Sequence, residues 1–440
     1  MSKLKISQCM IVKNEEKNIE KALSWGRAYM HEQIVVDTGS TDRTVELAKA
    51  MGAKVYYFDW VDDFSAAKNY AIEQTSGDWI AFLDADEYLT EEWAKKLPAL
   101  LEKSDRDGYD AVSTLIISIN KAGEPISVSK NPRFFRHLPE LRYRNPIHEI
   151  LFYQDHALTN RQVMDTGDEF PIYHTGYDPQ IMEEKKTSER NGRLLKRELE
   201  KDPDNYHIMG YLGDCYNGGV GHNTEGERYY RMALEKMPQS LNVGDERSAA
   251  TLVRLLAIVA DRKDDREFFV LYKEMTRRAV WVYDFDYMAG VVYIRNQEYE
   301  KAVVCFEKAL QISDQHGTSA YGVYMNQNIA GMWEMLARCY YETKNLSACV
   351  RTCVSLLKVD KERLDALMLL LLALKEEAPE EVLHFLSNIY DIHQTAERIF
   401  LLRAAVGAGT KGVLELLKKE CTPEELVYLD AGKRVHDEEG

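Results

Sequence analysis

The segment Gly77-Asp-Trp-Ile-Ala-Phe-Leu-Asp-Ala-Asp-Glu87 decides the fold that we predict for the N-terminal part of the chain. Its central run, Trp79–Leu83, is apolar enough to be an interior strand whose two faces are both covered. Three acidic residues, Asp84, Asp86 and Glu87, follow this strand directly. In open α/β sheets ligands bind beyond the carboxyl ends of the strands, so these carboxylates are candidates for a binding site.

The surrounding sequence has the pattern of an α/β fold up to about His174, because short β-branched runs alternate with amphipathic segments. We predict further strands at Ile6–Val12, Gln33–Asp37 and Lys54–Phe58, and helices at Glu15–Trp25, Thr41–Met51 and Ser65–Gln74. Connections of this length predict parallel pairing of the strands. Ser40 or Thr41 can cap the second helix, and Gly52 can end it with positive φ. Later extended pieces are predicted at Ala111–Ile119, Arg133–Arg136 and Ile172–His174.

Helical periodicity dominates from about Asp178 onward. Gly290, Tyr293, Ala302, Phe306 and Ala309 have a spacing similar to that of a tetratricopeptide unit, in which small residues let paired helices approach and aromatic residues fill the gap. Weaker copies start at Gly213 and Ala337, and an ordinary helical domain is the alternative. The predicted organisation is an α/β domain at residues 1–180, a helical linker at 181–204 and a tetratricopeptide-like domain at 205–440.

Composition excludes several classes of protein. The 440 residues include 56 Lys and Arg against 72 Asp and Glu, and a net charge of −16 argues against general nucleic-acid binding. The longest apolar run, Ala366–Leu374, has nine residues, whereas a membrane-spanning helix needs roughly 20. No leader segment is evident at the start, so we expect a cytoplasmic protein. The seven cysteines are scattered and are expected to be reduced thiols.

Polar loops follow three of the predicted strands and are expected to share one edge of the sheet: Lys13–Glu16, Asp37–Asp42 and Asp84–Glu87. A carboxylate there can accept hydrogen bonds from a uracil ring or a ribose, and a close Asp pair can hold a divalent cation. The alternatives are an Asx-turn at Asp37 and a turn or cap at Asp84. Neither the G-x-G-x-x-G nor the P-loop motif follows the first strand, which argues against hydride transfer and ATP hydrolysis.

A cationic residue, Lys68, opens the third helix together with Asn69. A cation near a helix N-terminus can assist binding of an anionic ligand. The alternative is a solvated lysine on the helix surface.

Four ordered motifs carry a resemblance to a known family: Met10–Glu16, Ile34–Thr44, Asp63–Asn69 and Gly77–Glu87. Together they resemble the inverting family 2 glycosyltransferases of GT-A fold, over about residues 5–180. The attached helical repeats resemble a subgroup that includes bacteriocin peptide glycosyltransferases of the sublancin type.

The resemblance implies roles for individual residues. It implies a nucleotide-sugar pocket formed by Val12, Asn14, Glu15, Asp37, Lys68, Asn69, Asp84 and Ala85. It also implies a divalent cation, Mn²⁺ or Mg²⁺, held by Asp84, Asp86 and a later histidine. His174 fits that position, and His148 is the competitor. Many relatives have Arg where this chain has Lys68, which keeps the charge but loses the planar bidentate fork.

Inverting transfer requires a base on the acceptor side. Glu149 is the candidate, and the adjacent His148 could hold it in place; the alternative is a surface carboxylate on an edge strand. We therefore expect a hexosyltransferase that uses a UDP-sugar and modifies a Cys, Ser or Thr side chain of a peptide or protein bound with the help of the repeats. A homodimer through the helical domain is also considered.

Two alternatives are a transferase acting on a lipid-linked or envelope saccharide, and a non-catalytic repeat scaffold. The cluster of acidic residues argues against the scaffold, because we expect its carboxylates to repel one another without a bound cation.

Overall fold

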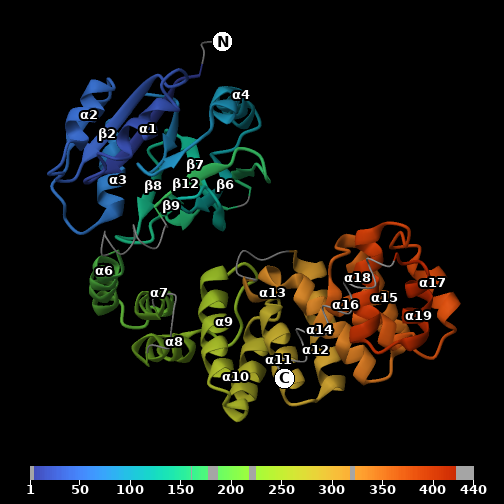
Figure 1. Ribbon diagram of the computed structural model, residues 1–440. Helices are drawn as coiled ribbons and strands as arrows, with labels where there is room; N and C mark the ends of the chain where they lie inside the picture. Colours follow the sequence, from blue (N-terminus) through green and yellow to red (C-terminus); the bar gives the residue numbers. More distant parts are fainter. Residues whose placement is uncertain (1–3, 160, 177–186, 218–223, 318–322, 423–440) are drawn as a thin grey trace. The chain divides into compact units, whose positions relative to one another are not determined.

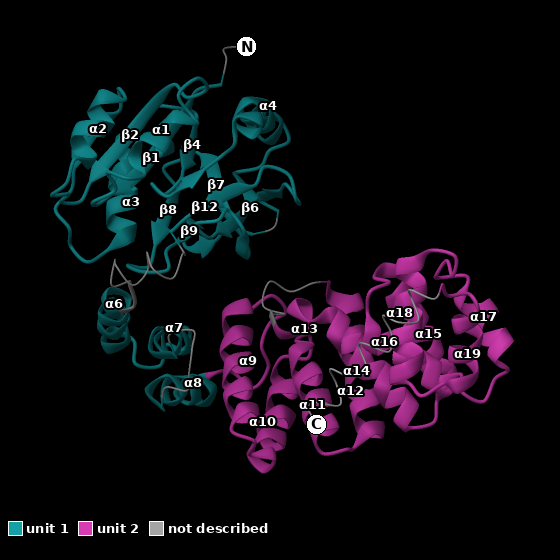
Figure 2. Ribbon diagram, viewed as in Figure 1, with its two compact units in different colours: residues 1–236 teal, residues 237–440 magenta. Residues whose placement is uncertain are grey.

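The structure, a computed structural model, describes residues 4–159, 161–176, 187–217, 224–317 and 323–422. The chain divides into two units, residues 1–236 and residues 237–440, which Figure 2 shows in teal and magenta. The domain boundaries predicted near residues 180 and 204 stay predictions.

The first unit is built on a mixed sheet with the strand order β3-β2-β1-β4-β7-β6-β12-β5, and β11 pairs with β6. Its strands are β1 (Ile6–Val12), β2 (Glu32–Asp37), β3 (Lys54–Tyr57), β4 (Trp79–Phe82), β5 (Glu87–Tyr88), β6 (Ala111–Ile119), β7 (Pro125–Arg136), β11 (Val163–Asp165) and β12 (Ile172–His174). The pairs β1–β2, β2–β3 and β1–β4 are parallel, as predicted, and β7 runs antiparallel to β4 and β6. The predicted α/β fold is confirmed.

Strand β4 is interior because both of its faces are covered. Trp79 and Ala81 pack in a core with α4, whereas Ile80 and Phe82 pack in a second core with α3. The helices of this part are α1 (Ile19–Ser24), α2 (Thr44–Ala50), α3 (Phe64–Glu73) and α4 (Glu91–Arg106). Figure 1 shows α1 to α4 next to the strands of this sheet. The residues that follow β4 are therefore held at the edge of a sheet that is packed on both faces.

Two predictions about helix starts are wrong. The first helix begins at Ile19, not Glu15, because the residues before it form a turn, in which the N–H groups of Asn18 and Ile19 both donate to the carbonyl of Glu15 at 2.9 Å. The second helix begins at Thr44, whose N–H donates to Asp42 Oδ1 at 3.0 Å, so neither Ser40 nor Thr41 caps it. The predicted end at Gly52 is confirmed, since its φ is +84°.

A small antiparallel sheet and three helices complete the first unit. The sheet consists of β8 (Leu141–Arg144), β9 (Ile150–Tyr153) and β10 (His156–Ala157), and the helices are α6 (Thr187–Lys201), α7 (Tyr206–Asn217) and α8 (Thr224–Lys236). Arg193 and Arg197 of α6 both bond the carboxylate of Asp62, in the loop before α3, at 2.7–2.8 Å. Helix α6 is thus tied to the same part of the chain that leads into Lys68.

The second unit is helical, with the elements α9 (Glu246–Asp261), α10 (Asp265–Arg278), α11 (Asp284–Arg295), α12 (Tyr299–His316), α13 (Val323–Gln327), α14 (Ile329–Glu342), α15 (Leu346–Val359), α16 (Leu364–Ala373), α17 (Pro379–Leu386), α18 (Thr395–Gly407) and α19 (Lys411–Lys419). A Cβ atom on Gly290 would lie 2.6 Å from the ring of Phe306, so only glycine lets α11 and α12 approach this closely. Gly213 and Tyr230 repeat the arrangement between α7 and α8, at 2.2 Å. This is the packing that the repeat spacing predicted.

Three further features concern the cysteines, the hydrophobicity of the helices and one hollow on the surface. All seven cysteines are free thiols, as expected. Among the helices that the structure describes, none has both the length and the hydrophobicity needed to cross a bilayer.

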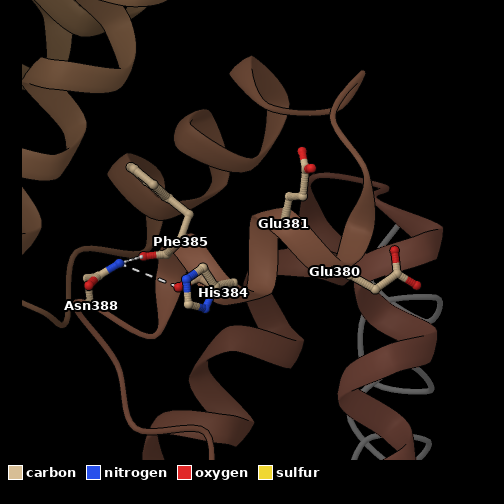
Figure 3. A pocket seen from close by; sticks show the side chains of 5 residues that line it. All are labelled: Glu380, Glu381, His384, Phe385 and Asn388. Carbon is tan, nitrogen blue, oxygen red and sulfur yellow. Dashed lines mark hydrogen bonds between the residues drawn. The ribbon is translucent and has the colours of Figure 1, made fainter.

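A shallow hollow of about 550 Å³ lies on α17, lined by Glu380, Glu381, His384, Phe385 and Asn388 (Figure 3). None of these five residues was predicted to act in a site.

Candidate active site

The loops after β1 and β2 are joined by hydrogen bonds at the carboxyl edge of the sheet. Asn14 N–H donates to Ser40 Oγ at 2.9 Å, and Thr41 N–H donates to Asn14 Oδ1 at 2.8 Å. Glu15 N–H donates to Thr44 Oγ1 at 2.7 Å. The structure therefore brings together two of the three loops that we expected to share one edge.

Asp37 is buried at the end of β2 and forms the Asx-turn that we considered as an alternative. Its carboxylate accepts hydrogen bonds from the N–H groups of Gly39 and Ser40, both at 3.1 Å. Val12, at the matching end of β1, is also buried. A role for these two residues in holding a nucleotide stays a prediction.

Lys68 is buried, so the alternative of a solvated surface lysine is wrong. Its Nζ lies 2.5 Å from Glu149 Oε1 and 3.9 Å from Asp84 Oδ1, and it faces the rings of Phe82 and Tyr143 at 5.3 and 5.0 Å. Burial by itself lowers the pKa of Lys68, but the two carboxylates outweigh burial and raise that pKa well above its ordinary value. Lys68 is therefore a permanent buried cation.

Arg133, on β7, is a second buried cation. Its Nη2 lies 3.2 Å from Asp84 Oδ2 and also bonds Glu87 Oε1. The order Glu149, Lys68, Asp84, Arg133, Glu87 is thus an alternating row of negative and positive side chains, which we call the charge row. Our expectation that the carboxylates repel one another without a bound cation is wrong, because two side-chain cations lie between them.

Asp86 and His174 form a separate pair next to the charge row. Strand β12 pairs with β5 so that His174 lies opposite Glu87, which brings His174 Nε2 to 3.4 Å from Asp86 Oδ1. Burial lowers the pKa of His174, but its hydrogen bond to Asp86 and the negative charges of Asp86, Glu87 and Asp84 together outweigh burial and raise that pKa above its usual range. The backbone also passes close by, since a Cβ on Gly176 would lie 2.1 Å from Asp86 Oδ2 and 2.8 Å from His174 Nε2.

The donor set of this pair fits a divalent cation, because a carboxylate oxygen and an imidazole nitrogen are ligands that Mn²⁺ accepts. Glycine at position 176 keeps the space beside both side chains clear of a side chain. Asp84, the third predicted ligand, points instead to Arg133 and Lys68. Among the residues that the structure describes, no group of three or more His, Cys, Asp and Glu side chains is arranged to hold a metal ion.

Glu149, the candidate base, is mostly shielded from water by the loop that carries it. Burial raises the pKa of Glu149, but the charge and hydrogen bond of Lys68 outweigh burial and lower it below its ordinary value. The predicted alternative, a carboxylate exposed on the surface, is therefore not what the structure has. His148 lies with its ring stacked on Tyr211 of α7, with 3.6 Å between the ring centroids.

Two further residues of the predicted pocket also have structural partners. The side-chain amide of Asn69 donates to the carbonyl of Tyr143 and accepts from its N–H, both at 2.9 Å, which fixes α3 against β8. Ala85 is buried between the two acidic residues of its loop. Their roles in binding a nucleotide sugar stay predictions.

Sequence reasoning missed Arg133 and Tyr211, and it gave Glu87 no role beyond its place in the acidic loop. The position of Arg133 directly before the buried pair Phe134-Phe135 was a signal, since an arginine at the entry to a core needs a partner for its charge. The chain has no comparable local signal for Tyr211, which lies in the helical part.

Comparison with known proteins gives the family that the first part of the chain is similar to. Residues 7–166 match the family model for glycosyl transferase family 2, and residues 287–316, in α11 and α12, match a tetratricopeptide repeat. A part that matches family 2 glycosyltransferases is therefore followed by helices of which one pair matches a tetratricopeptide repeat. The predicted family and the predicted order of the domains are confirmed.

Individual relatives are similar to this chain over part of their length. A TPR repeat-containing protein of Synechococcus elongatus is 34% identical over 211 residues, which are 47% of this chain and 51% of the relative. The SPbeta prophage-derived glycosyltransferase SunS of Bacillus subtilis is 29% identical over 206 residues, which are 46% of this chain and 47% of SunS. The chain thus spans about half the length of these curated relatives.

A solved structure is similar over a shorter stretch. It is glucosyl-3-phosphoglycerate synthase from Mycobacterium tuberculosis in complex with Mn²⁺, UDP and glucosyl-3-phosphoglycerate. The similarity has 26% identity and a TM-score of 0.23, and it covers 27% of this chain and 45% of the synthase.

Proposed function

We propose that this chain is an inverting glycosyltransferase that moves a hexose from a UDP-sugar to a side chain of a peptide or protein. One observation carries the proposal. The acidic loop after β4, in a domain that matches glycosyl transferase family 2, lies beside a partly buried histidine, His174, and is linked through Lys68 to a partly buried carboxylate, Glu149, from a later part of the chain. Donor-binding and proton-accepting groups are thus close together in one unit.

The donor side of the proposal uses the edge of the sheet. Val12, Asn14, Glu15 and Asp37 would line the pocket for the uracil and ribose, because carboxylate and amide groups at strand ends can bond the ring and the hydroxyl groups. The mutual hydrogen bonds of these loops support this role, since they hold Asn14 and its neighbours in fixed positions before any ligand arrives.

A divalent cation belongs to the proposal, and Asp86 and His174 would hold it, with Asp84 beside them. When bound, such an ion neutralises the charge that accumulates on a leaving diphosphate. This chain supplies two further positive charges near that place, on Lys68 and Arg133. We infer that they keep Asp84 in one orientation, because each approaches a different oxygen of its carboxylate.

Glu149 is proposed to take the proton of the acceptor. In the transfer step, the acceptor atom bonds to the anomeric carbon, the bond from that carbon to the diphosphate breaks, and the proton passes to Glu149. The lowered pKa of Glu149 keeps its carboxylate ionised at neutral pH and also makes it a weak base, so an acceptor that loses its proton easily suits it best. A cysteine thiol, with a pKa of about 8.5, loses its proton more easily than a serine hydroxyl and therefore needs a weaker base.

The acceptor class rests on two points. The helices after the transferase domain resemble repeats that form extended binding surfaces suited to a peptide, and SunS, one of the relatives, is named a glycosyltransferase. We therefore propose a peptide or protein acceptor. A cytoplasmic location and a homodimer through the helical part stay predictions.

A donor screen tests the proposal. The full chain is incubated with Mn²⁺ and a set of UDP-hexoses, and released UDP is measured with and without candidate peptides containing Cys, Ser or Thr. We expect hydrolysis of one donor and a peptide whose mass rises by one hexose. Transfer only to a lipid-linked or envelope saccharide would contradict the proposed class of acceptor. If no donor releases UDP, the proposal that the chain is an enzyme is wrong.

A further inference from the structure

The segment Asn145–Glu149, which ends in the proposed base, is held on one side by helix α3. Ser65 Oγ donates to the carbonyl of Asn145 at 2.6 Å, and Phe64 N–H donates to the carbonyl of Pro146 at 2.9 Å. The ion pair with Lys68, described above, comes from the same helix. Helix α3 thus fixes both ends of the segment.

The middle of the segment is held by helices that lie outside the family 2 match. Ile147 is buried in a cluster with Leu194 of α6 and Leu212 of α7. The ring of His148 lies flat on the ring of Tyr211, with an angle of 11° between their planes. Helices α6 and α7 therefore contact the two residues directly before Glu149.

The backbone of the segment is strained at His148. Its φ is +53°, in the left-handed region, which is sterically unfavourable for a residue other than glycine. Such a conformation persists only where the surroundings enforce it. Since the ring of His148 rests on Tyr211, the stack is the contact best placed to enforce it, and a change of backbone at His148 would redirect the side chain of Glu149.

We propose that Tyr211 is a positioning residue for the transfer reaction. Its ring holds His148 in the left-handed conformation, and His148 in turn aims the carboxylate of Glu149. This inference rests on the proposed function, in which Glu149 accepts the proton. It assigns α6 and α7 to the catalytic apparatus itself, in addition to any part that the later helices take in binding the acceptor.

Three variants of the full chain test this role. Tyr211→Leu removes the aromatic ring, and Tyr211→Phe keeps it. Tyr216→Leu is the matched control, because Tyr216 lies in the same helix and stacks on Tyr229 of α8, with 5.6 Å between the centroids and 13° between the planes. Hydrogen exchange of the peptide covering residues 144–150 reports the order of the segment, and UDP release gives kcat and the KM for the donor.

We expect Tyr211→Leu to raise the exchange rate of this peptide at least threefold and to lower kcat at least tenfold. Calorimetry with UDP and Mn²⁺ should give an affinity within twofold of the parent, since the donor loops are untouched. Tyr211→Phe and Tyr216→Leu should match the parent within twofold in all three measurements.

The inference is overturned if Tyr211→Leu leaves the exchange rate or kcat within twofold of the parent, or if Tyr216→Leu loses as much activity as Tyr211→Leu. Should the parent chain release no UDP from any donor, the proposed function fails. Hydrogen exchange then decides alone whether Tyr211 orders the segment, with Tyr216→Leu as the reference.

Discussion

The ammonium group of Lys68 lies 2.5 Å from the carboxylate of Glu149, and both groups are shielded from water. The two residues come from different layers of the first unit, helix α3 and the loop that leads into β9. Removing one member of a buried ion pair costs more than the pair contributes, because the other charge is left without compensation. The pair is therefore a sensitive point for stability as well as for the proposed chemistry.

Replacing Lys68 by Met should destabilise the first unit strongly. The substitution removes the cation that lies between Glu149 and Asp84, and breaking a buried pair costs about 3–5 kcal/mol. Urea unfolding measures the loss. Lys103→Met, on the exposed surface of α4, should change the free energy of unfolding by less than about 0.5 kcal/mol. Equal effects of the two substitutions would contradict the importance of the charge row.

Replacing Asp86 by Ala should weaken the binding of Mn²⁺ by about tenfold or more, because one of the two paired donors is lost. Calorimetric titration of Mn²⁺ into the protein with UDP measures this affinity. Asp107→Ala, at the exposed end of α4, is the control and should leave it unchanged. Undiminished binding and transfer in Asp86→Ala would remove Asp86 from the proposed cation site.

Glu32 should make the stability of the first unit depend on acid pH. Burial raises the pKa of Glu32, but hydrogen bonds from Lys54, Ser76 and Ser7 outweigh burial and lower the pKa to about 2. Because the folded pKa lies below the unfolded value of 4.5, the stabilisation is fully present above that value and is lost as the pH falls toward 2.

The substitution Glu32→Gln should therefore cost about 3 kcal/mol at pH 7, and the difference from the parent should shrink steadily between pH 4.5 and pH 2. Urea unfolding at a series of pH values measures it. The exposed carboxylate of Glu46 provides the comparison, and Glu46→Gln should show a much smaller change. A pH-independent cost of Glu32→Gln would mean that the loss comes from packing.

Replacing Gly290 by Ala should destabilise the second unit by about 1–3 kcal/mol, because the new methyl group overlaps the buried ring of Phe306. Thermal unfolding measures the loss, and adding Phe306→Leu should recover part of it. Gly192→Ala, in α6, meets no atom within 4 Å and should stabilise its helix by up to about 1 kcal/mol. A neutral Gly290→Ala would contradict the close approach of α11 and α12.

The parts of the fold that could be predicted are those that depend on local pattern. The strands around Trp79–Phe82 follow from continuous apolar runs, and the polar residues after them mark the edge at which parallel strands end. Helix starts were less predictable: nothing in the composition of residues 13–18 indicates that they form turns and that α1 begins only at Ile19.

The contacts of the site were harder to predict because they depend on pairing between distant segments. Arg133 reaches Asp84 and Glu87 only because β7 lies beside β4, and its strand was visible in the sequence merely as a short extended piece. From the sequence alone, Lys68 could be either solvated or buried, because α3 buries small and polar residues along with apolar ones. Only tertiary packing decides between a solvated and a buried lysine.

The attachment of α6 through Arg193 and Arg197 to Asp62 has a practical consequence for protein engineering. A chimaera that joined this transferase to the repeats of a relative near residue 180 would lose the ion pairs of these two arginines with Asp62. A crossover placed after Lys236, where the first unit ends, would carry α6 to α8 along with the loops they support. Exchange of the helical second unit should therefore succeed at the later junction and fail at the earlier one.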